Sequence, residues 1–164
     1  MDWYPWIVFA HIVGAFGFAM GHGASALMAF RLRTERDPAR IAAMLDLSLM
    51  GMNVLTWAGL LLIASGIAGA FVNGLWGKGW IWASLVLLVV IGGLMTPLGA
   101  IHYNKVRRAI GVRQPRAKKD EPLPEPVSPA ELDALLTGPQ PWILAGVGGG
   151  GFVVILALMH FKPF

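Results

Sequence analysis

The residues of this chain best suited to chemistry are four histidines, His11, His22, His102 and His160. An imidazole can hold a metal ion, carry a proton or ligate haem iron. His11 and His22 are eleven residues apart, and at about 3.6 residues per turn this spacing places both rings on one face of a helix, about 16 Å apart along its axis. The sequence has no cysteine, which excludes thiolate metal sites and disulfides.

The segments around these histidines are those of a membrane protein. The chain is 56% hydrophobic and 13% charged, whereas an ordinary soluble domain has about 25% charged residues. Four apolar runs without Asp, Glu, Lys or Arg approach or exceed the roughly 20 residues needed to cross a bilayer, and each should be helical because lipid offers the backbone no partner. We therefore expect an all-α bundle of four transmembrane helices, forming one integral membrane domain over residues 1–164. The apolar runs are residues 6–30, 48–72, 80–101 and 142–161.

The expected helices cover residues of about 6–30, 38–72, 80–102 and 142–161. The second begins ahead of its apolar run because Asp37 and Pro38 are a typical N-cap and first-turn proline. Residues 73–79 form a short turn, so the second and third helices should make an antiparallel hairpin. Pro97 has no backbone N–H to donate, and the third helix should kink or loosen just before His102.

Residues 103–141 are Pro-rich and charged and have no core pattern, which predicts a linker between the third and fourth helices. Ser128 and Glu131 have the spacing of a capping box. A stripe of leucines over residues 132–136 follows, so the linker should carry one short amphipathic helix.

The positions of Lys and Arg orient the chain in the membrane. Four lie in residues 31–40 and seven in residues 105–119, and only Lys78 and Lys162 lie elsewhere. By the positive-inside rule the linker is cytoplasmic and both termini lie on the outer side. The net charge of +4 then faces anionic lipid, and we expect the lipid bilayer, and no nucleic acid, as its partner.

One face of the first helix carries residues with unusually small side chains. Gly14 shares the side of the two histidines, and Gly17 and Gly21 have the Gly-x-x-x-Gly spacing that permits close approach of another helix or of a flat, rigid group. A b-type haem is such a group, and it needs two neutral imidazoles on different helices at matching depth in an apolar slot.

By depth, the histidines form an outer pair, His11 with His160, and an inner pair, His22 with His102. The outer pair matches in depth, whereas straight helices offset the inner pair by about 9 Å, which a kink or tilt would reduce. We predict haem b as the cofactor, with His11 and His160 as axial ligands of the iron and with His22, and His102 as a further candidate, at an inner site. The glycines would then give the porphyrin room: Gly14, Gly17 and Gly21.

Each of these histidines also has a structural interpretation. His102 and His160 lie at helix ends, where an imidazole often only anchors the helix at the interface. His22 lies well inside the membrane, where a polar ring is by default a functional candidate. A hydrogen bond to a polar residue of the second helix would also satisfy His22, and the candidates are Asn53, Thr56 and Ser65.

The stretch FAHIVGAFGFAMGHGASALMAFRLRTERDPARIAAMLDLS, residues 9–48, resembles a family of bacterial four-helix integral membrane proteins whose activity is not established. The resemblance covers about the first hundred residues and implies a bacterial inner (plasma) membrane location. More distantly, the layout is similar to copper-resistance D-type and HemJ-type membrane proteins, with His11 and Arg31 matching their pattern. The Trp and Gly pair that those families place in the first helix is replaced here by residues 16–20, which argues against their oxidase activity.

The predicted function is electron transfer, or an accessory role, in a membrane redox complex with other membrane subunits or with further copies of the chain. The sequence offers no nucleophile, phosphate cradle or membrane carboxylate pair, so we do not expect an enzyme that acts alone. Two alternatives stay open. One is a structural subunit of a membrane complex, and the other is a small transporter or metal-permeation protein without haem.

Overall fold

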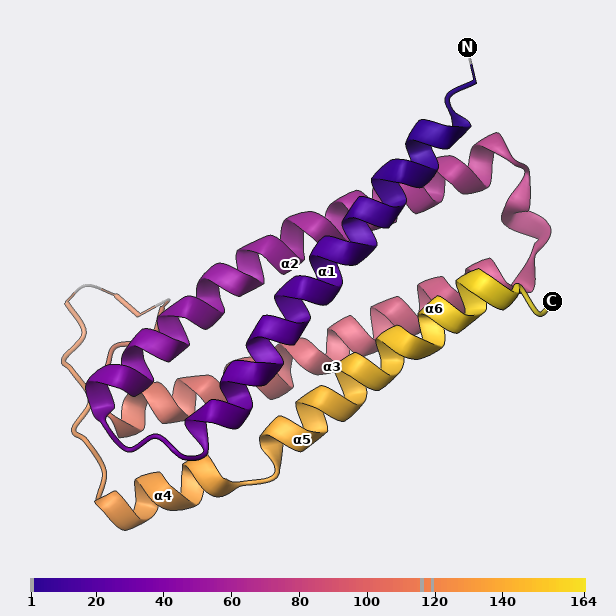
Figure 1. The fold of residues 1–164 in the computed structure, drawn as a ribbon. Coiled ribbons are helices and arrows are strands. Elements are labelled where there is room, and N and C mark those ends of the chain that lie inside the picture. Colours follow the sequence, from indigo (N-terminus) through magenta and orange to yellow (C-terminus); the bar gives the residue numbers. More distant parts are fainter. Residues whose placement is uncertain (1, 116, 119) are drawn as a thin grey trace.

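The computed structural model describes residues 2–115, 117–118 and 120–164 of the chain. These residues form helices and no strand. Four helical segments are long and apolar enough to cross a membrane: α1 (Tyr4–Leu32), α2 (Pro38–Val72), α3 (Gly79–Ala109) and the last part of the chain within Pro129–Phe161. The expected all-α class is therefore confirmed, with four helical segments that are long and apolar enough to cross a membrane (Figure 1).

The outer faces of these helices expose large apolar side chains. Phe16, Leu27, Trp57 and Val89 are each more exposed than buried. In water such a surface would be unfavourable, since removing apolar surface from water lowers the free energy by about 25 cal/mol per Å². Acyl chains are the natural neighbours of this surface.

One helix boundary agrees with expectation, and another differs. α2 begins at Pro38 as expected, and the Asp37 carboxylate caps it by accepting a hydrogen bond from the backbone N–H of Ala39 at 2.9 Å. α3 continues to Ala109, so the expected end at residue 102 and linker start at 103 were wrong. The cause is packing, because Val106 is fully buried well beyond the apolar run. α3 also remains one α-helix through Pro97.

Between α3 and the next helix, the described residues are not helical. Residues 116 and 119 of the predicted linker lie outside the described part of the chain. α4 (Pro129–Thr137) then begins after Ser128, whose hydroxyl accepts a hydrogen bond from the Glu131 backbone N–H at 3.3 Å. The end of the linker returns to α3, since the Val127 N–H donates to the Ala109 carbonyl at 3.0 Å.

The fourth membrane-spanning segment begins earlier than expected and contains a change of helix type. It consists of α5 (Gln140–Leu144), the π-helical turn η2 (Ala145–Gly150) and α6 (Gly151–Phe161). The π segment coincides with the glycine-rich stretch AGVGGG. Glycines weaken the preference for the α-helix by about 1 kcal/mol each, and π-turns inside helices are frequent at functional sites.

The helices pair as α1 with α2 and α3 with α6. α2 and α3 are joined by a short turn that contains the 3-10 helix η1 (Leu75–Gly77) and run antiparallel, as expected, but they pack little against each other. In Figure 1 the two pairs meet at the end that carries α4 and separate toward the end that carries both chain termini.

The end with α4 holds the largest buried core, which we call the cap core. It joins α1, α2, α3 and α4 mostly beyond the apolar runs. Two polar contacts reinforce it: Arg33 Nη1 donates to the Gly138 carbonyl at 2.7 Å, and Arg36 pairs with Asp133. Its buried residues are Leu32, Ile41, Leu45, Val106, Ala109, Ile110, Leu132 and Leu136.

Candidate cofactor-binding cavity

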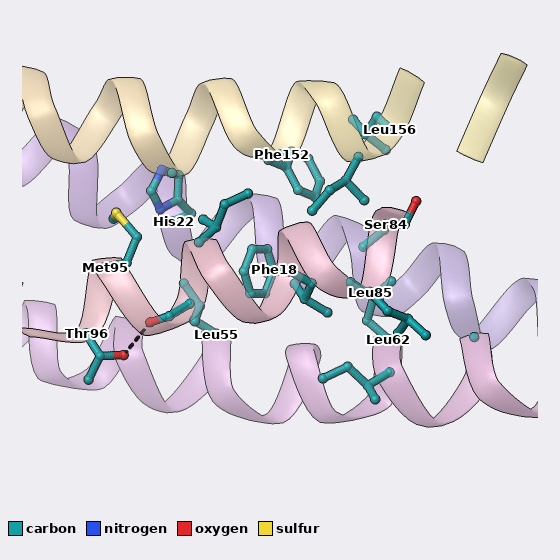
Figure 2. Close-up of a pocket in the computed structure, with 18 of the residues that line it drawn as sticks. Phe18, His22, Leu55, Leu62, Ser84, Leu85, Met95, Thr96, Phe152 and Leu156 are labelled. Carbon is teal, nitrogen blue, oxygen red and sulfur yellow. Dashed lines mark hydrogen bonds between the residues drawn. The ribbon is translucent and has the colours of Figure 1, made fainter. Parts of the chain in front are cut away.

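The space between the two helix pairs is an open cavity of about 1320 Å³ with mostly apolar walls. His11 and His22 line it from α1, and His160 lines it from α6. Figure 2 shows its middle part, where Phe18 of α1 and Phe152 of α6 face one another; their rings stack with centroids 5.9 Å apart. The structure thus brings three of the four predicted histidines to one cavity.

His11 is held in one orientation by α2. Its Nδ1 lies 3.0 Å from the carbonyl oxygen of Leu62 and 3.2 Å from the Ser65 hydroxyl. A carbonyl only accepts hydrogen bonds, so Nδ1 carries the proton and, in the neutral ring, Nε2 keeps a free lone pair. The ring lies against α2 because Gly66 has no side chain, and a Cβ there would be 3.0 Å from His11 Cε1.

His22 lies deeper along α1, and its Nε2 is buried without a hydrogen-bond partner among the described residues. The predicted structural partners are not used: Ser65 bonds to His11, and Thr56 donates to the carbonyl of Met52. The His22 ring instead packs on the π segment, where a Cβ at Gly148 would lie 2.7 Å from His22 Nε2. Met95 of α3 approaches the same point, as Figure 2 shows.

His160 lies one residue before the end of α6, with its ring edge-on to Phe161 at 4.8 Å between centroids. It lines the cavity from the wall opposite to α1. The outer histidines of the sequence analysis, His11 and His160, therefore belong to the same cavity but to different helices.

His102 does not belong to this cavity. It lines a separate pocket of about 310 Å³ between α3 and the α4–α5 segment, next to Lys105. The expected inner pair is thus not assembled, since His22 faces η2 and His102 faces α4.

The three glycines of α1 serve a different purpose from the predicted one. A Cβ at Gly14 would lie 2.8 Å from the backbone nitrogen of Leu62, and one at Gly17 would lie 3.0 Å from the Ala58 Cβ. At Gly21 the nearest atoms are those of Leu55, at 3.2 Å. These glycines make the close crossing of α1 and α2, and none of the three lines the cavity in which a porphyrin was expected.

Sequence reasoning missed the residues that close the middle of the cavity around Gly148, chiefly Met95 and Phe152. The signal was partly present, because glycines at 146–151 indicate a close helix crossing. Gly148 makes that crossing with α1, whereas Gly151 packs on Ile91 of α3. Nothing in the spacing of Met95 or Phe152 distinguishes them from lipid-facing residues.

Within the described residues, no group of three or more His, Asp or Glu side chains gathers to hold a metal ion. Haem iron needs only two axial protein ligands, because the porphyrin supplies the other four. No protein-family model, curated protein or solved structure matches the chain.

Proposed function

We propose that this chain binds b-type haem in the cavity between α1–α2 and α3–α6, with His11 and His160 as the axial ligands. The observation that carries the proposal is the bond from His11 Nδ1 to the Leu62 carbonyl, beside an apolar cavity whose opposite wall holds His160. Histidines that ligate a metal almost always donate their other ring N–H to a carbonyl or carboxylate in this way.

The surroundings of His11 also fit a haem ligand. The hydrogen bond fixes the ring orientation and raises the basicity of the free nitrogen. The walls of the cavity are mostly apolar, and the open space between the helix pairs leaves room for a large planar group. Bound haem would supply one-electron exchange, and His11 and His160 would hold it near the end of the bundle that carries the termini.

The proposed setting is the inner membrane of a bacterium. The Arg residues of the α1–α2 loop and the α4 segment lie at one end of the bundle, and the positive-inside rule makes that end cytoplasmic. His11 and His160 would then lie near the outer surface. Electron transfer or an accessory role in a redox complex follows, together with other membrane subunits or with another copy of the chain.

The test is the absorption spectrum of the full chain, produced with ample haem and purified in detergent. We expect a Soret band and, on reduction, the sharp bands of a six-coordinate low-spin haem. His11→Ala and His160→Ala should each abolish these bands or convert them to a high-spin spectrum. His102→Ala is the matched control, because its ring lies outside the cavity.

Two outcomes would contradict the proposal. The first is a chain that is helical and monodisperse but shows no Soret band. The second is a haem spectrum that neither His11→Ala nor His160→Ala changes. If the intact chain binds no haem, the two alternative functions, a structural subunit and a small transporter, stay open. Transport of a solute or metal ion that depends on His22 would then identify the transporter.

A further inference from the structure

The second pocket lies where α3 meets the α4–α5 segment and has a volume of about 310 Å³. From α3 it is lined by Leu98, Ile101, His102 and Lys105, and from the other side by Leu135 and Gln140, among others. It is separate from the histidine cavity, so its use does not depend on haem binding.

This pocket crosses the boundary between apolar and charged residues on α3. Leu98 and Ile101 are 40% and 57% exposed and lie at the end of the apolar run, where acyl chains would touch them. Lys105 follows one turn later, on the side of the bundle that is rich in Lys and Arg. The pocket therefore spans the depth at which hydrocarbon gives way to phospholipid headgroups.

The charge of Lys105 is left without a partner in the described part of the chain. Its ammonium group makes no ion pair and no hydrogen bond there, although other cations nearby do. Asp133, an acidic residue of α4, is paired with Arg36. His102 is 9% exposed and likewise has no hydrogen bond within the described residues. The pocket thus presents a positive charge that no acidic side chain of the described residues pairs with.

We propose that this pocket binds one anionic phospholipid of the cytoplasmic leaflet, such as phosphatidylglycerol. Lys105 pairs with the phosphate, and the His102 ring forms the floor beneath it. One acyl chain lies along Leu98 and Ile101. A free phosphate ion would match Lys105 but leave these two apolar side chains uncovered, which is why the lipid is favoured. Basic pockets beside membrane helices on the cytoplasmic side are a known form of headgroup site.

The experiment counts bound lipid by native mass spectrometry on the full chain in detergent, titrated with phosphatidylglycerol or phosphatidylcholine. We expect one phosphatidylglycerol that persists at activation energies that remove phosphatidylcholine. Lys105→Gln should weaken phosphatidylglycerol binding about fivefold, the effect of one lysine near a charged membrane surface. Arg108→Gln is the matched control, because Arg108 is an exposed cation of the same helix that does not line the pocket.

Ala134→Trp provides a second variant, since a large side chain at this exposed, pocket-lining position should fill the pocket and block the lipid while Lys105 stays in place. Equal losses of phosphatidylglycerol binding in Lys105→Gln and Arg108→Gln would show that general surface charge causes the effect, and this would overturn the proposal. So would unchanged binding in both pocket variants. Displacement of the lipid by millimolar inorganic phosphate would assign the pocket to a free anion.

Discussion

The imidazole of His22 lies directly on the backbone of Gly148, in the π-helical turn of the fourth membrane-spanning segment. The contact leaves His22 Nε2 both buried and without a hydrogen bond within the described residues. A buried polar atom without a partner costs about 1–3 kcal/mol. This cost and the weak α-helical preference of the glycines fall at the same level of the bundle. We therefore expect the stability of the protein to be most sensitive to small substitutions in the middle of the cavity.

The first prediction concerns this contact. Gly148→Ala should destabilise the protein by about 1–3 kcal/mol, as overpacking of a filled interior does. The added Cβ would lie 2.7 Å from His22 Nε2, and the rigid ring cannot yield without moving as a whole. Thermal unfolding in detergent measures the loss.

The control for that substitution is Gly150→Ala, because no atom lies within 4 Å of a Cβ at Gly150. It should be neutral or slightly stabilising, since alanine favours helix over glycine. In a double-mutant cycle, His22→Ala should recover part of the stability lost in Gly148→Ala. Strict additivity of the two changes would show that the ring and the glycine do not interact.

The second prediction concerns the crossing of α1 and α2. Gly14→Ala should force the helices apart, because the new Cβ would lie 2.8 Å from Leu62 N and 3.0 Å from Leu62 Cα, and backbone cannot move aside as a side chain can. We expect a loss of at least about 1–3 kcal/mol in thermal unfolding. Gly23→Ala has open space around its Cβ and should leave stability unchanged.

Gly14→Ala should also affect the proposed haem site, since Leu62 is the residue whose carbonyl orients His11. In haem-loaded protein the low-spin bands should therefore weaken in Gly14→Ala and persist in Gly23→Ala. If Gly14→Ala keeps the stability and the spectrum of the unchanged protein, the close crossing does not position His11.

The sequence was sufficient to predict the helices and the start of α2, because an apolar run of about 20 residues and an Asp-Pro cap are local signals. It also placed His11, His22 and one glycine-rich crossing on inward faces. The end of α3 could not be predicted from hydropathy, since Val106 is buried by residues of α2 and α4 that are distant in sequence. The sequence indicated that another helix approaches the glycines of α1, but it did not identify that helix as α2, because the contact depends on residues that are distant in sequence.

The histidine pairing shows the limit of arguing from depth alone. Depth placed His22 and His102 in one pair, but helix rotation about the axis turns His22 toward Gly148 and His102 toward α4. The rotation of each helix about its own axis is fixed by which small residues contact each other across the helices. A single sequence does not show which of these contacts form. Depth and rotation agree for His11 and His160, which line one cavity.

The third prediction is a dependence of stability on pH from Glu35, in the loop between α1 and α2. Hydrogen bonds from the backbone N–H groups of Asp37, at 3.2 Å, and Arg36, at 3.0 Å, hold the pKa of the Glu35 carboxyl below its ordinary value, with help from Arg40 and Arg31. A lowered pKa means that the folded state favours the charged form. The resulting stability is present above the ordinary pKa of glutamate, about 4.3, and is lost as the pH falls through the lower, folded-state pKa.

The measurement compares the protein with Glu35→Gln in thermal unfolding between neutral and acidic pH. At neutral pH the unchanged protein should be the more stable, and the difference should shrink as the pH falls below the ordinary glutamate range. Asp120→Asn, a change in the linker with no ion pair or hydrogen bond among the described residues, is the control. A stability difference between the unchanged protein and Glu35→Gln that grows on acidification would contradict the prediction.

The fourth prediction ranks the forces that hold α4 on the bundle. Leu136 is 3% exposed in the cap core, so Leu136→Ala should cost about 2–5 kcal/mol through lost burial and the cavity left behind. Asp133→Asn breaks the pair with Arg36, but both side chains are about half exposed, at 43% and 52%, and such surface pairs contribute about 1 kcal/mol or less. Hydrogen exchange of the α4 amides should therefore accelerate strongly in Leu136→Ala and little in Asp133→Asn. Added salt should reduce only the effect of Asp133→Asn, since screening acts on exposed charges and leaves apolar burial intact.

A larger acceleration of exchange in Asp133→Asn than in Leu136→Ala would mean that charge, and not the leucine face, holds α4 against α1, α2 and α3.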